Sequence, residues 1–493
     1  MRISVILLTV LLQGCTTHVQ QLDSFGKKME IVAALPSQEG LSQLDRELLI
    51  LAEKCPLKHE ELVGADLKDS ARSVQARWKY LNCIYEEPPT GKRRALVVLL
   101  DGTGNSGPSE SNIWRLYNRA LAKAVDGEPV IPYYDRGVGT NFQRATGSLF
   151  GAGVDRNVRQ AYRFLVETYK PADKNYAGDR IYIFGFSRGA YTARTLNGMI
   201  KYAGLAHLNS TPPDALDETR WMRLFGNLHR KTYGLFNEYT QSNTGEADFD
   251  KSLADGLNDY KRDKNIETYD VTVEAIGVFD TVPAIGFFQN DDPDNHRLEL
   301  YANRGYHAMS IDEQRDDFRL LRFGVPQRDG QRLEEMWFAG VHSDVGGGYY
   351  NTKKNVPTGC DIPHSYGLEG ISLGWMLKNF EADDIFTNAD FPVNCYTGVL
   401  HDEYFGSLSS LYAARGIARR RPVACDNVHQ SVIQRIQSAN KLPLPHPKRE
   451  SKEGHYVPTN LSHSPDKVFC ILPTGALRES CRQLNHDCGA VPK

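Results

Sequence analysis

The chain has 493 residues, of which 41% are hydrophobic and 24% are charged, and its formal net charge at pH 7 is −3. This composition is typical of a soluble globular protein. Because positive and negative charges nearly balance, nothing indicates a polyanion-binding surface, and we expect no nucleic acid among the partners. The length allows one large domain with insertions, or two domains.

Residues 1–14 have the pattern of an export signal. Arg2 is followed by an apolar run over residues 3–12 and then by Gln13-Gly14-Cys15. About ten apolar residues are too few to cross a bilayer but suit the h-region of a signal peptide. The segment ending at Cys15 resembles a bacterial lipobox, in which the cysteine is lipidated and becomes the first mature residue. We therefore expect a lipid-anchored protein of the bacterial cell envelope, on the outer or inner membrane and facing the periplasm. An uncleaved apolar leader is the alternative.

Eight cysteines remain after Cys15, and an even number permits disulfides in an exported chain. Cys481 and Cys488 are the favoured local pair because only a short loop has to close between them. No Cys-x-x-Cys motif occurs, and no His/Cys cluster has the spacing of a zinc site. The sequence therefore predicts neither a metal nor another cofactor.

Residues 15–92 are polar with helical stretches and contain no recognisable chemistry, whereas strands and helices alternate from residue 93 onward. The first strand, Ala95–Leu100, is a continuous apolar run, as expected when helices cover both faces of a parallel sheet. Further strands are predicted at 130–134, 180–184, 271–279 and 335–341, and helices at 112–125, 155–169 and 188–202. This alternation predicts an α/β fold with a mostly parallel sheet and right-handed crossovers.

Residues 205–268 interrupt the alternation with a polar, helix-rich stretch, which we interpret as an insertion above the carboxyl edge of the sheet. Four apolar residues in it have the spacing of one helix face: Trp221, Leu224, Phe225 and Leu228. They either pack on the domain or form a lid that contacts lipid. We expect a catalytic core over 93–350, including this insertion, and a C-terminal region over 351–493 that packs on the core.

Ser187 lies in Gly185-Phe186-Ser187-Arg188-Gly189, between a predicted strand and a predicted helix. In a Gly-x-Ser-x-Gly turn the serine is held in a strained conformation above the sheet edge, and the glycines allow strand and helix to pass closely. The motif alone is weak, but its strand–turn–helix context is strong. We predict the α/β-hydrolase fold with Ser187 as nucleophile; the alternative is an ordinary buried turn serine.

A serine nucleophile needs a base, and the base needs an acid that orients it, in the chain order Ser, Asp or Glu, His for this fold. Two strand ends after Ser187 supply that order, one leading into Asp280 and the other into His342. Open α/β sheets place their sites at the carboxyl ends of strands. We therefore predict a triad of Ser187, Asp280 and His342. A capping or turn role for Asp280, and a loop role for His342, are the alternatives.

Two competitors remain for the acid and the base. Asp344 could orient His342, although two residues are a short reach back to a neighbouring imidazole. His307 could be the base, but it precedes an expected helix, so a scaffolding contact with Asp312 or Arg315 is favoured.

The loop after the first strand supports two different interpretations. In a serine hydrolase, the oxyanion hole takes one N–H from Arg188 and a second from this loop, where Gly102 or Thr103 is the expected donor. The same loop resembles the phosphoaspartate loop of haloacid-dehalogenase-type phosphatases, in which Asp101 would be the nucleophile and magnesium would be required. The second acidic position of that family is occupied here by Thr103.

A set of motifs between about residue 93 and about residue 462 is similar to the α/β-hydrolase family that includes the class-one type VI lipase effectors. The matching segments are 100–105, 134–140, 155–157, 185–194, 279–282, 307–315, 340–349, 428–432 and 456–461. The resemblance aligns the family's triad with Ser187, Asp280 and His342, and it implies that acyl esters of phospholipids are the substrate.

The chain departs from this family at its N-terminus, because an injected effector would not carry an export signal. The leader and Cys15 therefore weaken the inference of an antibacterial toxin without affecting the hydrolase chemistry. No secretion or immunity partner can be identified from the sequence. A non-catalytic envelope lipoprotein on a degenerate hydrolase scaffold is the non-enzymatic alternative.

Overall fold

The computed structural model describes residues 71–103, 105, 110–137, 148–207, 246–283, 300–349, 367–387, 395–401, 420, 422, 426–437, 456, 458 and 460. The predicted signal peptide with Cys15, the pair Cys481 and Cys488, and the apolar stripe that begins at Trp221 lie outside the described residues. In the described part of the chain, no helix is both long and apolar enough to cross a membrane.

Seven strands of the described chain form one sheet in the order β2-β1-β3-β6-β7-β8-β9. All neighbouring pairs in this sheet are parallel. The strands are β1 (Ala95–Leu100), β2 (Val130–Asp135), β3 (Arg180–Phe186), β6 (Ala275–Phe279), β7 (Arg304–Ser310), β8 (Arg332–Phe338) and β9 (Asn427–Val428). The predicted parallel α/β sheet is confirmed, and the chain has the α/β-hydrolase fold.

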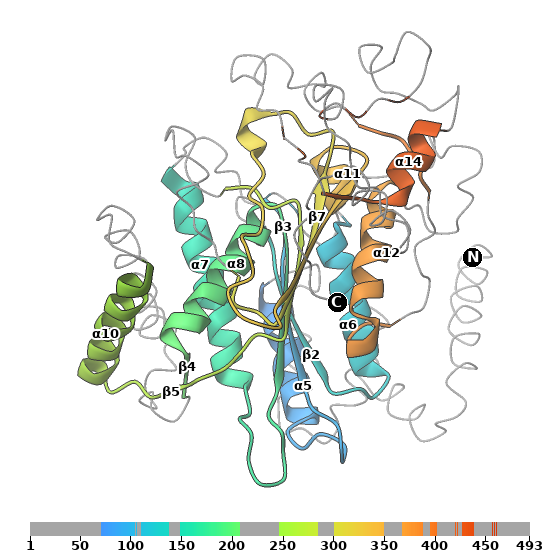
Figure 1. Ribbon diagram of the computed structural model, residues 1–493. Coiled ribbons are helices and arrows are strands. Elements are labelled where there is room, and N and C mark those ends of the chain that lie inside the picture. Colours follow the sequence, from blue (N-terminus) through green and yellow to red (C-terminus); the bar gives the residue numbers. More distant parts are fainter. Residues whose placement is uncertain are drawn as a thin grey trace, which may run out of the picture.

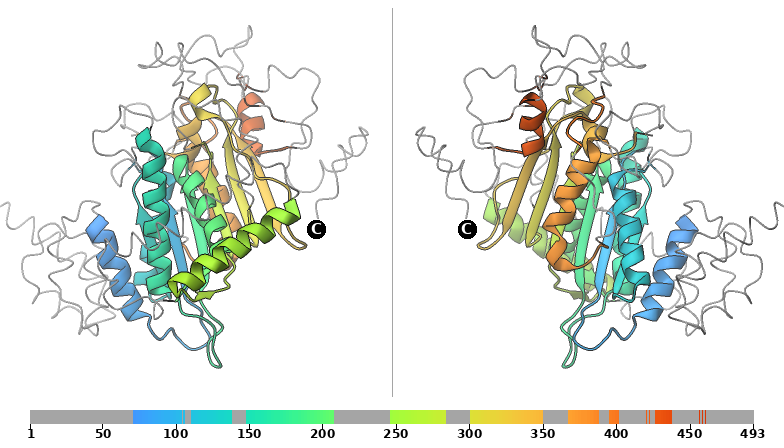
Figure 2. Two further views of the ribbon diagram at one scale, coloured as in Figure 1. Left: turned by 90° about the vertical axis from the view of Figure 1, so that its left-hand side faces the viewer. Right: turned by 90° about the vertical axis from the view of Figure 1, so that its right-hand side faces the viewer.

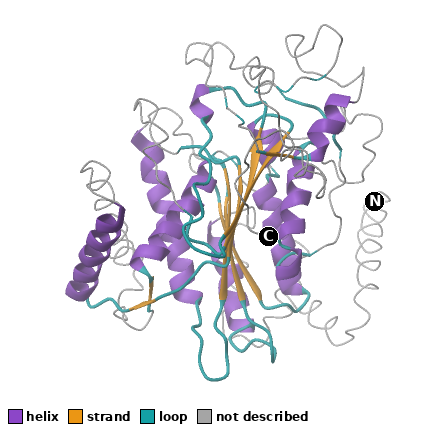
Figure 3. Ribbon diagram, in the orientation of Figure 1, coloured by secondary structure: helices purple, strands orange, loops and turns teal. Residues whose placement is uncertain are grey.

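Helices cover both faces of the sheet (Figures 1 and 3). On one face lie α7 (Ser148–Thr168) and α8 (Arg188–Ala203), and on the other lie α6 (Asn112–Val125) and α12 (Glu369–Asn379), as the two side views show (Figure 2). Helix α5 (Ala71–Ile84) packs beside β2 at the sheet edge. Because β1 is covered on both sides, all six of its residues are buried.

Helix α6 shows how local sequence fixes these elements. Its N-cap is Ser111, whose side chain accepts a hydrogen bond from the Trp114 backbone N–H. Its buried apolar residues recur at the spacing of one helix face: Ile113, Leu116, Tyr117, Ala120, Leu121 and Ala124. The spacing of these apolar residues therefore determines which side of the helix faces the sheet.

Several predicted bounds need correction. Strand β7 was not predicted, and His307 lies within it rather than before a helix. The sequence of β7 begins with Arg304 and carries His307 and Ser310 at buried positions, so it lacks the apolar run that identified the other strands. Strand β6 begins at Ala275 instead of residue 271, and β8 covers Arg332–Phe338 instead of 335–341.

The described part of the 205–268 insertion lies away from the carboxyl edge of the sheet. Strands β4 (Leu205–Ala206) and β5 (Thr268–Tyr269) pair antiparallel and bring the ends of the insertion together. In α10 (Glu246–Lys264), Lys261 Nζ lies 3.4 Å from Ala203 O, at the end of α8 remote from Ser187 (Figure 1). The expectation of a lid is therefore wrong for α10, because the β4–β5 pair anchors it at the opposite end of α8.

Residues after position 350 complete the core in the described chain. Strand β9 extends the sheet beside β8, so the sheet continues past the predicted core boundary. Asp383 forms a bidentate ion pair with Arg304 on β7, at 3.0 and 2.7 Å. Cys83 and Cys395 are both disulfide-bonded.

Candidate active site

Ser187 forms a strained turn between β3 and α8. Its φ of 59° and ψ of −126° lie where a non-glycine residue is rarely found. Its backbone N–H donates to Phe279 O on β6 at 3.0 Å, and its carbonyl accepts from Ala190 N at 3.1 Å and Tyr191 N at 3.2 Å. The turn is therefore held by the neighbouring strand and by the first turn of α8, which over-determine the strained conformation.

The glycines on either side of Ser187 are required by close backbone approach. A Cβ atom on Gly185 would lie 2.5 Å from Gly189 O, and a Cβ atom on Gly189 would lie 2.2 Å from Leu100 O. Neither contact is possible for a larger residue, because the obstructing atoms belong to the backbone. The two glycines of the motif are therefore needed for the close approach of strand and helix, as the sequence indicated.

Asp280 and His342 meet beside this turn. Asp280 follows β6, which pairs with β3 so that Phe279 stands opposite Phe186. His342 begins α11 (His342–Gly346), and its Nδ1 lies 2.6 Å from Asp280 Oδ2. The imidazole packs on Phe186, the residue before Ser187, with ring centroids 4.7 Å apart. Three segments far apart in sequence therefore bring Ser187, Asp280 and His342 together at the carboxyl edge of the sheet.

Arg420 also contacts Asp280, and the sequence did not identify it. Its Nη1 donates to Asp280 Oδ1 at 2.5 Å and its Nη2 donates to Asp280 Oδ2 at 2.9 Å. Ser310 adds its backbone N–H at 2.7 Å and its hydroxyl at 3.0 Å to the same carboxylate. Arg420 is the middle residue of the basic run 419–421, and nothing in the local sequence distinguishes it from its two neighbours.

The surroundings of the pair set its charge state. Burial is the largest influence on Asp280 and raises its pKa, but the charge of Arg420 and the hydrogen bond from His342 outweigh it and hold the pKa well below its usual range. Burial lowers the pKa of His342, although Asp280 opposes this. A neutral imidazole beside an ionised carboxylate is the arrangement that a general base requires.

A second ion pair supports the backbone of His342. The His342 N–H donates to Glu313 Oε2 at 3.2 Å, and Glu313 pairs with Arg315 at 2.7 Å. Burial is the largest influence on Glu313 and raises its pKa, but Arg315 and Arg420 together outweigh burial and lower the pKa to about 2. Asn460 Nδ2 donates to Glu313 O at 2.9 Å. The C-terminal region therefore helps to hold the loop after β7.

The loop after β1 lies next to the Ser187 turn, but it does not offer both expected donors. A Cβ atom on Gly102 would lie 2.8 Å from Phe186 Cδ1, which places the loop beside the residue before Ser187. The Gly102 N–H donates to Asp101 Oδ1 at 2.7 Å. The expectation that Gly102 donates to an oxyanion is therefore not met, because its own neighbour already accepts that hydrogen. Thr103 remains the candidate in this loop.

Asp101 stabilises this loop. It is 2% exposed, and besides Gly102 it accepts hydrogen bonds from Asn105 Nδ2 at 3.4 Å, Ser111 Oγ at 2.5 Å and Tyr134 OH at 2.8 Å. A carboxylate occupied on both oxygens has no lone pair directed at a substrate, which weakens the phosphatase alternative. Among the described residues, no group of three or more His, Cys, Asp or Glu side chains could hold a metal ion.

The two competitors, Asp344 and His307, contact other groups. Asp344 Oδ1 lies 2.6 Å from His401 Nδ1, and its Oδ2 accepts the N–H of Val341 at 3.0 Å. His307 Nε2 accepts the Thr281 N–H at 3.1 Å, and its Nδ1 lies 3.1 Å from a Glu335 carboxylate oxygen. His307 thus has a scaffolding role, with Glu335 in place of the expected Asp312 or Arg315, because β7 runs beside β8 there.

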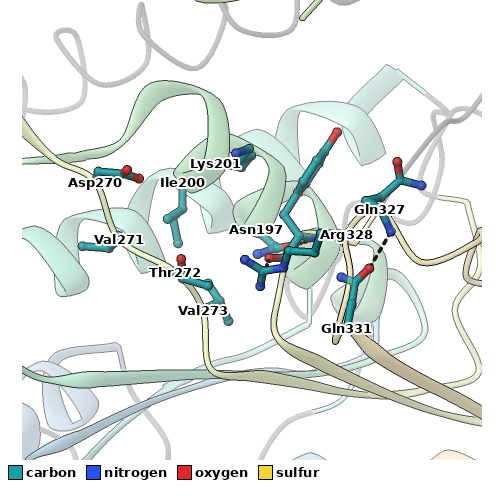
Figure 4. A pocket seen from close by; sticks show the side chains of 11 residues that line it. Asn197, Ile200, Lys201, Asp270, Val271, Thr272, Val273, Gln327, Arg328 and Gln331 are labelled. Atoms are coloured by element: carbon teal, nitrogen blue, oxygen red, sulfur yellow. Dashed lines mark hydrogen bonds between the residues drawn. The ribbon is translucent and has the colours of Figure 1, made fainter. Parts of the chain in front are cut away.

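A pocket in the described chain lies at the end of α8 that is remote from Ser187. Asn197, Ile200 and Lys201 of α8 line it together with residues 270–273, Tyr301 and residues 327, 328 and 331 (Figure 4). Its lining includes none of Ser187, Asp280 and His342. Because this pocket lies away from the three residues that the sequence predicts as the triad, we do not assign the substrate to it.

Comparison with known proteins gives one family. The model of the catalytic domain of Tle1-like phospholipase effectors of the type VI secretion system matches residues 94–379. A curated relative, an uncharacterized protein of Saccharomyces cerevisiae, is 29% identical over 278 residues, which cover 50% of this chain and 37% of that protein. The chain thus spans well under half the length of this relative.

Three solved structures are distantly similar. An uncharacterized Pseudomonas aeruginosa protein has a TM-score of 0.35 and 17% identity, covering 70% of this chain and 52% of that chain. The Tle1 effector bound to the VgrG spike of the type 6 secretion system has a TM-score of 0.27 and 20% identity, covering 53% and 52%. Esterase 2 of Thermogutta terrifontis has a TM-score of 0.26 and 11% identity, covering 61% and 88%. None of the three supports an argument about this chain.

Proposed function

The chain belongs to the family of Tle1-like phospholipase effectors of the type VI secretion system, and we propose that it is a serine hydrolase that cleaves acyl esters of phospholipids. Ser187 is the nucleophile, His342 the general base and Asp280 the acid that orients it. The observation that carries this proposal is the contact of His342 Nδ1 with Asp280 Oδ2 at 2.6 Å, beside a serine on a strained strand-to-helix turn.

The reaction has two halves. Ser187 Oγ attacks the ester carbonyl carbon while His342 Nε2 accepts its proton, and the same proton passes to the leaving alcohol when the ester bond breaks. Water then attacks the acyl-enzyme, again with His342 as base, and the fatty acid leaves. Asp280 holds the Nδ1–H tautomer throughout. The Arg188 N–H at the start of α8, with Thr103, stabilises the oxyanion.

The family supplies the substrate class, since its matched description is that of phospholipase effectors. Analysis by mass spectrometry of the products from a mixed panel of phospholipids and glycerides tests it. We expect free fatty acid and lysophospholipid to dominate. Release of fatty acid from glycerides alone would contradict the phospholipid assignment while leaving the ester hydrolase intact.

For location, we propose an envelope protein anchored through a lipidated Cys15. Disulfides persist in oxidising compartments, so the bonded Cys83 and Cys395 are consistent with export. Cys15→Ser should release the protein from membranes without loss of activity on soluble esters, since stable anchoring needs attached acyl chains. Sedimentation of that variant with membranes after a salt wash would contradict the assignment.

Ser187→Ala tests the nucleophile. Hydrolysis of a soluble p-nitrophenyl ester should fall by about 10⁴-fold or more, and labelling by a fluorophosphonate probe should disappear. Ser343→Ala is the matched control, because Ser343 is the neighbour of His342 on α11 and has no role in the proposed chemistry. Activity of Ser187→Ala within tenfold of the parent, or an unlabelled parent protein, would favour the non-catalytic lipoprotein.

A further inference from the structure

We propose that Arg420 is a positioning residue of the active site, which fixes the orientation of the Asp280 carboxylate and sets the pH range in which His342 acts as a base. The proposal rests on the triad proposed above. Arg420 would act through Asp280 and would not touch the substrate.

The first support is the geometry of the pair. Two parallel hydrogen bonds join the guanidinium to both carboxylate oxygens of Asp280, at 2.5 and 2.9 Å. The guanidinium is itself held, because Nη1 donates to Ser310 O at 3.0 Å and Nη2 donates to Phe318 O at 2.8 Å. A bidentate arginine fixes the plane of a carboxylate in a way that a point charge cannot.

This fixed plane matters because one oxygen serves two partners. Asp280 Oδ2 accepts from Arg420 Nη2 and also lies 2.6 Å from His342 Nδ1. Rotation of the carboxylate away from the imidazole would break a bond to the guanidinium. Arg420 therefore keeps Oδ2 aimed at Nδ1, which in turn keeps Nε2 available to Ser187.

The second support is the charge around His342. Asp280, Glu313 and Arg315 all influence its charge state from the strand ends that surround it, and Arg420 neutralises Asp280 from the far side. The side chains of Arg420 and Asp280 are 2% and 0% exposed, so solvent screens these charges little. Without Arg420 the carboxylates would outnumber the cations, and His342 would take up a proton more readily, at higher pH.

The third support is the origin of Arg420. The family match ends at residue 379, so Arg420 comes from the region beyond it. That region is fastened beside the site by Asp426, which pairs with Arg322 at 2.8 Å and accepts from Trp337 Nε1 at 3.0 Å. The C-terminal region thus supplies this charge from outside the residues that match the family.

The experiment measures kcat, KM and the pH profile of soluble ester hydrolysis for the full-length chain with Arg420→Met and Arg420→Lys. Arg94→Met is the matched control, because Arg94 forms a comparable buried fork with Asp179, at 3.0 and 2.7 Å, at the opposite end of the sheet. Ser187→Ala is run in parallel, so that failure of the proposed nucleophile is recognised separately.

For Arg420→Met we expect kcat to fall by about 10²-fold, as when a mutation away from the chemistry misplaces a catalytic group, with KM little changed. The acid limb of kcat/KM should move by about one pH unit to higher pH. Arg420→Lys keeps the positive charge but loses the bidentate hydrogen bonds to Asp280. We therefore expect the acid limb of kcat/KM to stay in place while kcat falls by about tenfold. Arg94→Met should lower the melting temperature and leave the limb in place.

The proposal would be overturned if the folded Arg420→Met protein kept the parental kcat and the acid limb of its kcat/KM profile stayed at the parental pH. If Arg420→Met does not fold, Arg420→Lys decides, and parental kcat in that variant would show that the fork positions nothing. A shift of the limb in Arg94→Met equal to that in Arg420→Met would also overturn it. If Ser187→Ala loses activity and any of these results is also obtained, the proposed nucleophile is retained and only the positioning role of Arg420 is rejected.

Discussion

Asp101 and Asp280 occupy equivalent places in the fold and have opposite electrostatics. Each follows a buried parallel strand, β1 or β6, and each is almost completely buried, at 2% and 0% exposed. Each accepts hydrogen bonds on both carboxylate oxygens. By strand-end position and burial alone, the two carboxyl groups are alike.

The difference lies in the charge of the donors. The donors to Asp101 are neutral, namely the Gly102 N–H, an amide and two hydroxyls, and burial therefore dominates and raises the pKa of Asp101 from 3.8 to about 6. Asp280 faces the guanidinium of Arg420 and the imidazole of His342, and its pKa is lowered despite burial. The number of hydrogen bonds does not decide whether a buried carboxylate stays ionised; the charge of its partners does.

Asp280→Asn should give the largest effect. Loss of the carboxylate presents an amide to Arg420 and to the Ser310 N–H, which cannot reverse their donor roles, and it removes the acceptor that fixes the His342 tautomer. We expect kcat to fall by about 10⁴-fold. Because the charge of Arg420 is then buried without a partner carboxylate, the free energy of unfolding should also fall by about 3–5 kcal/mol. Ester hydrolysis and urea unfolding measure the two effects, and retention of a tenth of parental kcat would refute the assignment of the acid.

Asp344→Asn tests whether proximity in sequence could substitute for this geometry. Asp344 binds His401 and the Val341 N–H, so its loss should loosen α11 without changing the His342 tautomer. We expect a decrease in kcat of about tenfold or less, by comparison with about 10⁴-fold for the acid of a triad. A larger loss than that of Asp280→Asn would exchange the two roles.

Asp101→Asn should be tolerated, because the hydroxyls of Ser111 and Tyr134 can reverse and accept from the new amide. We expect activity within about threefold of the parent, since hydrogen bonds in a satisfied neutral network contribute about 1 kcal/mol each. Complete loss of activity in a correctly folded Asp101→Asn protein would revive the phosphatase alternative.

The same variant has a signature in the pH dependence of stability. The pKa of Asp101 is about 6 when folded and 3.8 as its ordinary value, so the folded protein binds more protons between these pH values. The contribution of Asp101 to the free energy of unfolding is therefore full below pH 3.8 and falls as pH rises through 6. Relative to the parent, Asp101→Asn should be more stable at pH 8 than at pH 4, by urea unfolding. A difference independent of pH would contradict the raised pKa.

The smallest expected effect is that of metal removal. EDTA or added Mg²⁺ should change ester hydrolysis by less than about twofold, because triad chemistry uses no metal ion. Measurement after dialysis against EDTA, with and without restored Mg²⁺, is sufficient. Activity that disappears with EDTA and returns with Mg²⁺ would favour the phosphatase alternative, in which Asp101 and not Ser187 is the nucleophile.

Much of the fold followed from local pattern. Apolar runs identified β1, β3, β6 and β8, and the 3.6-residue period over residues 155–169 identified most of α7, because a buried strand and an amphipathic helix each leave a signature in consecutive residues. Strand β7 left none, since its buried polar residues His307 and Ser310 interrupt the apolar run and are satisfied by Thr281 and Asp280, just past the end of β6.

For the site, local sequence determined Ser187 and the need for its glycines, and chain order with strand ends determined the candidates Asp280 and His342. Only the tertiary structure decided that Asp280 and not Asp344 contacts His342, that the Gly102 N–H is already used by Asp101, and that α10 lies away from the site. The contact of Arg420 with Asp280 was also found only in the tertiary structure. The conformation of a turn depends on residues that are neighbours along the chain. The charge state of a buried carboxylate depends on groups from up to 140 residues away. No local pattern therefore indicates which arginine of a basic run contacts Asp280.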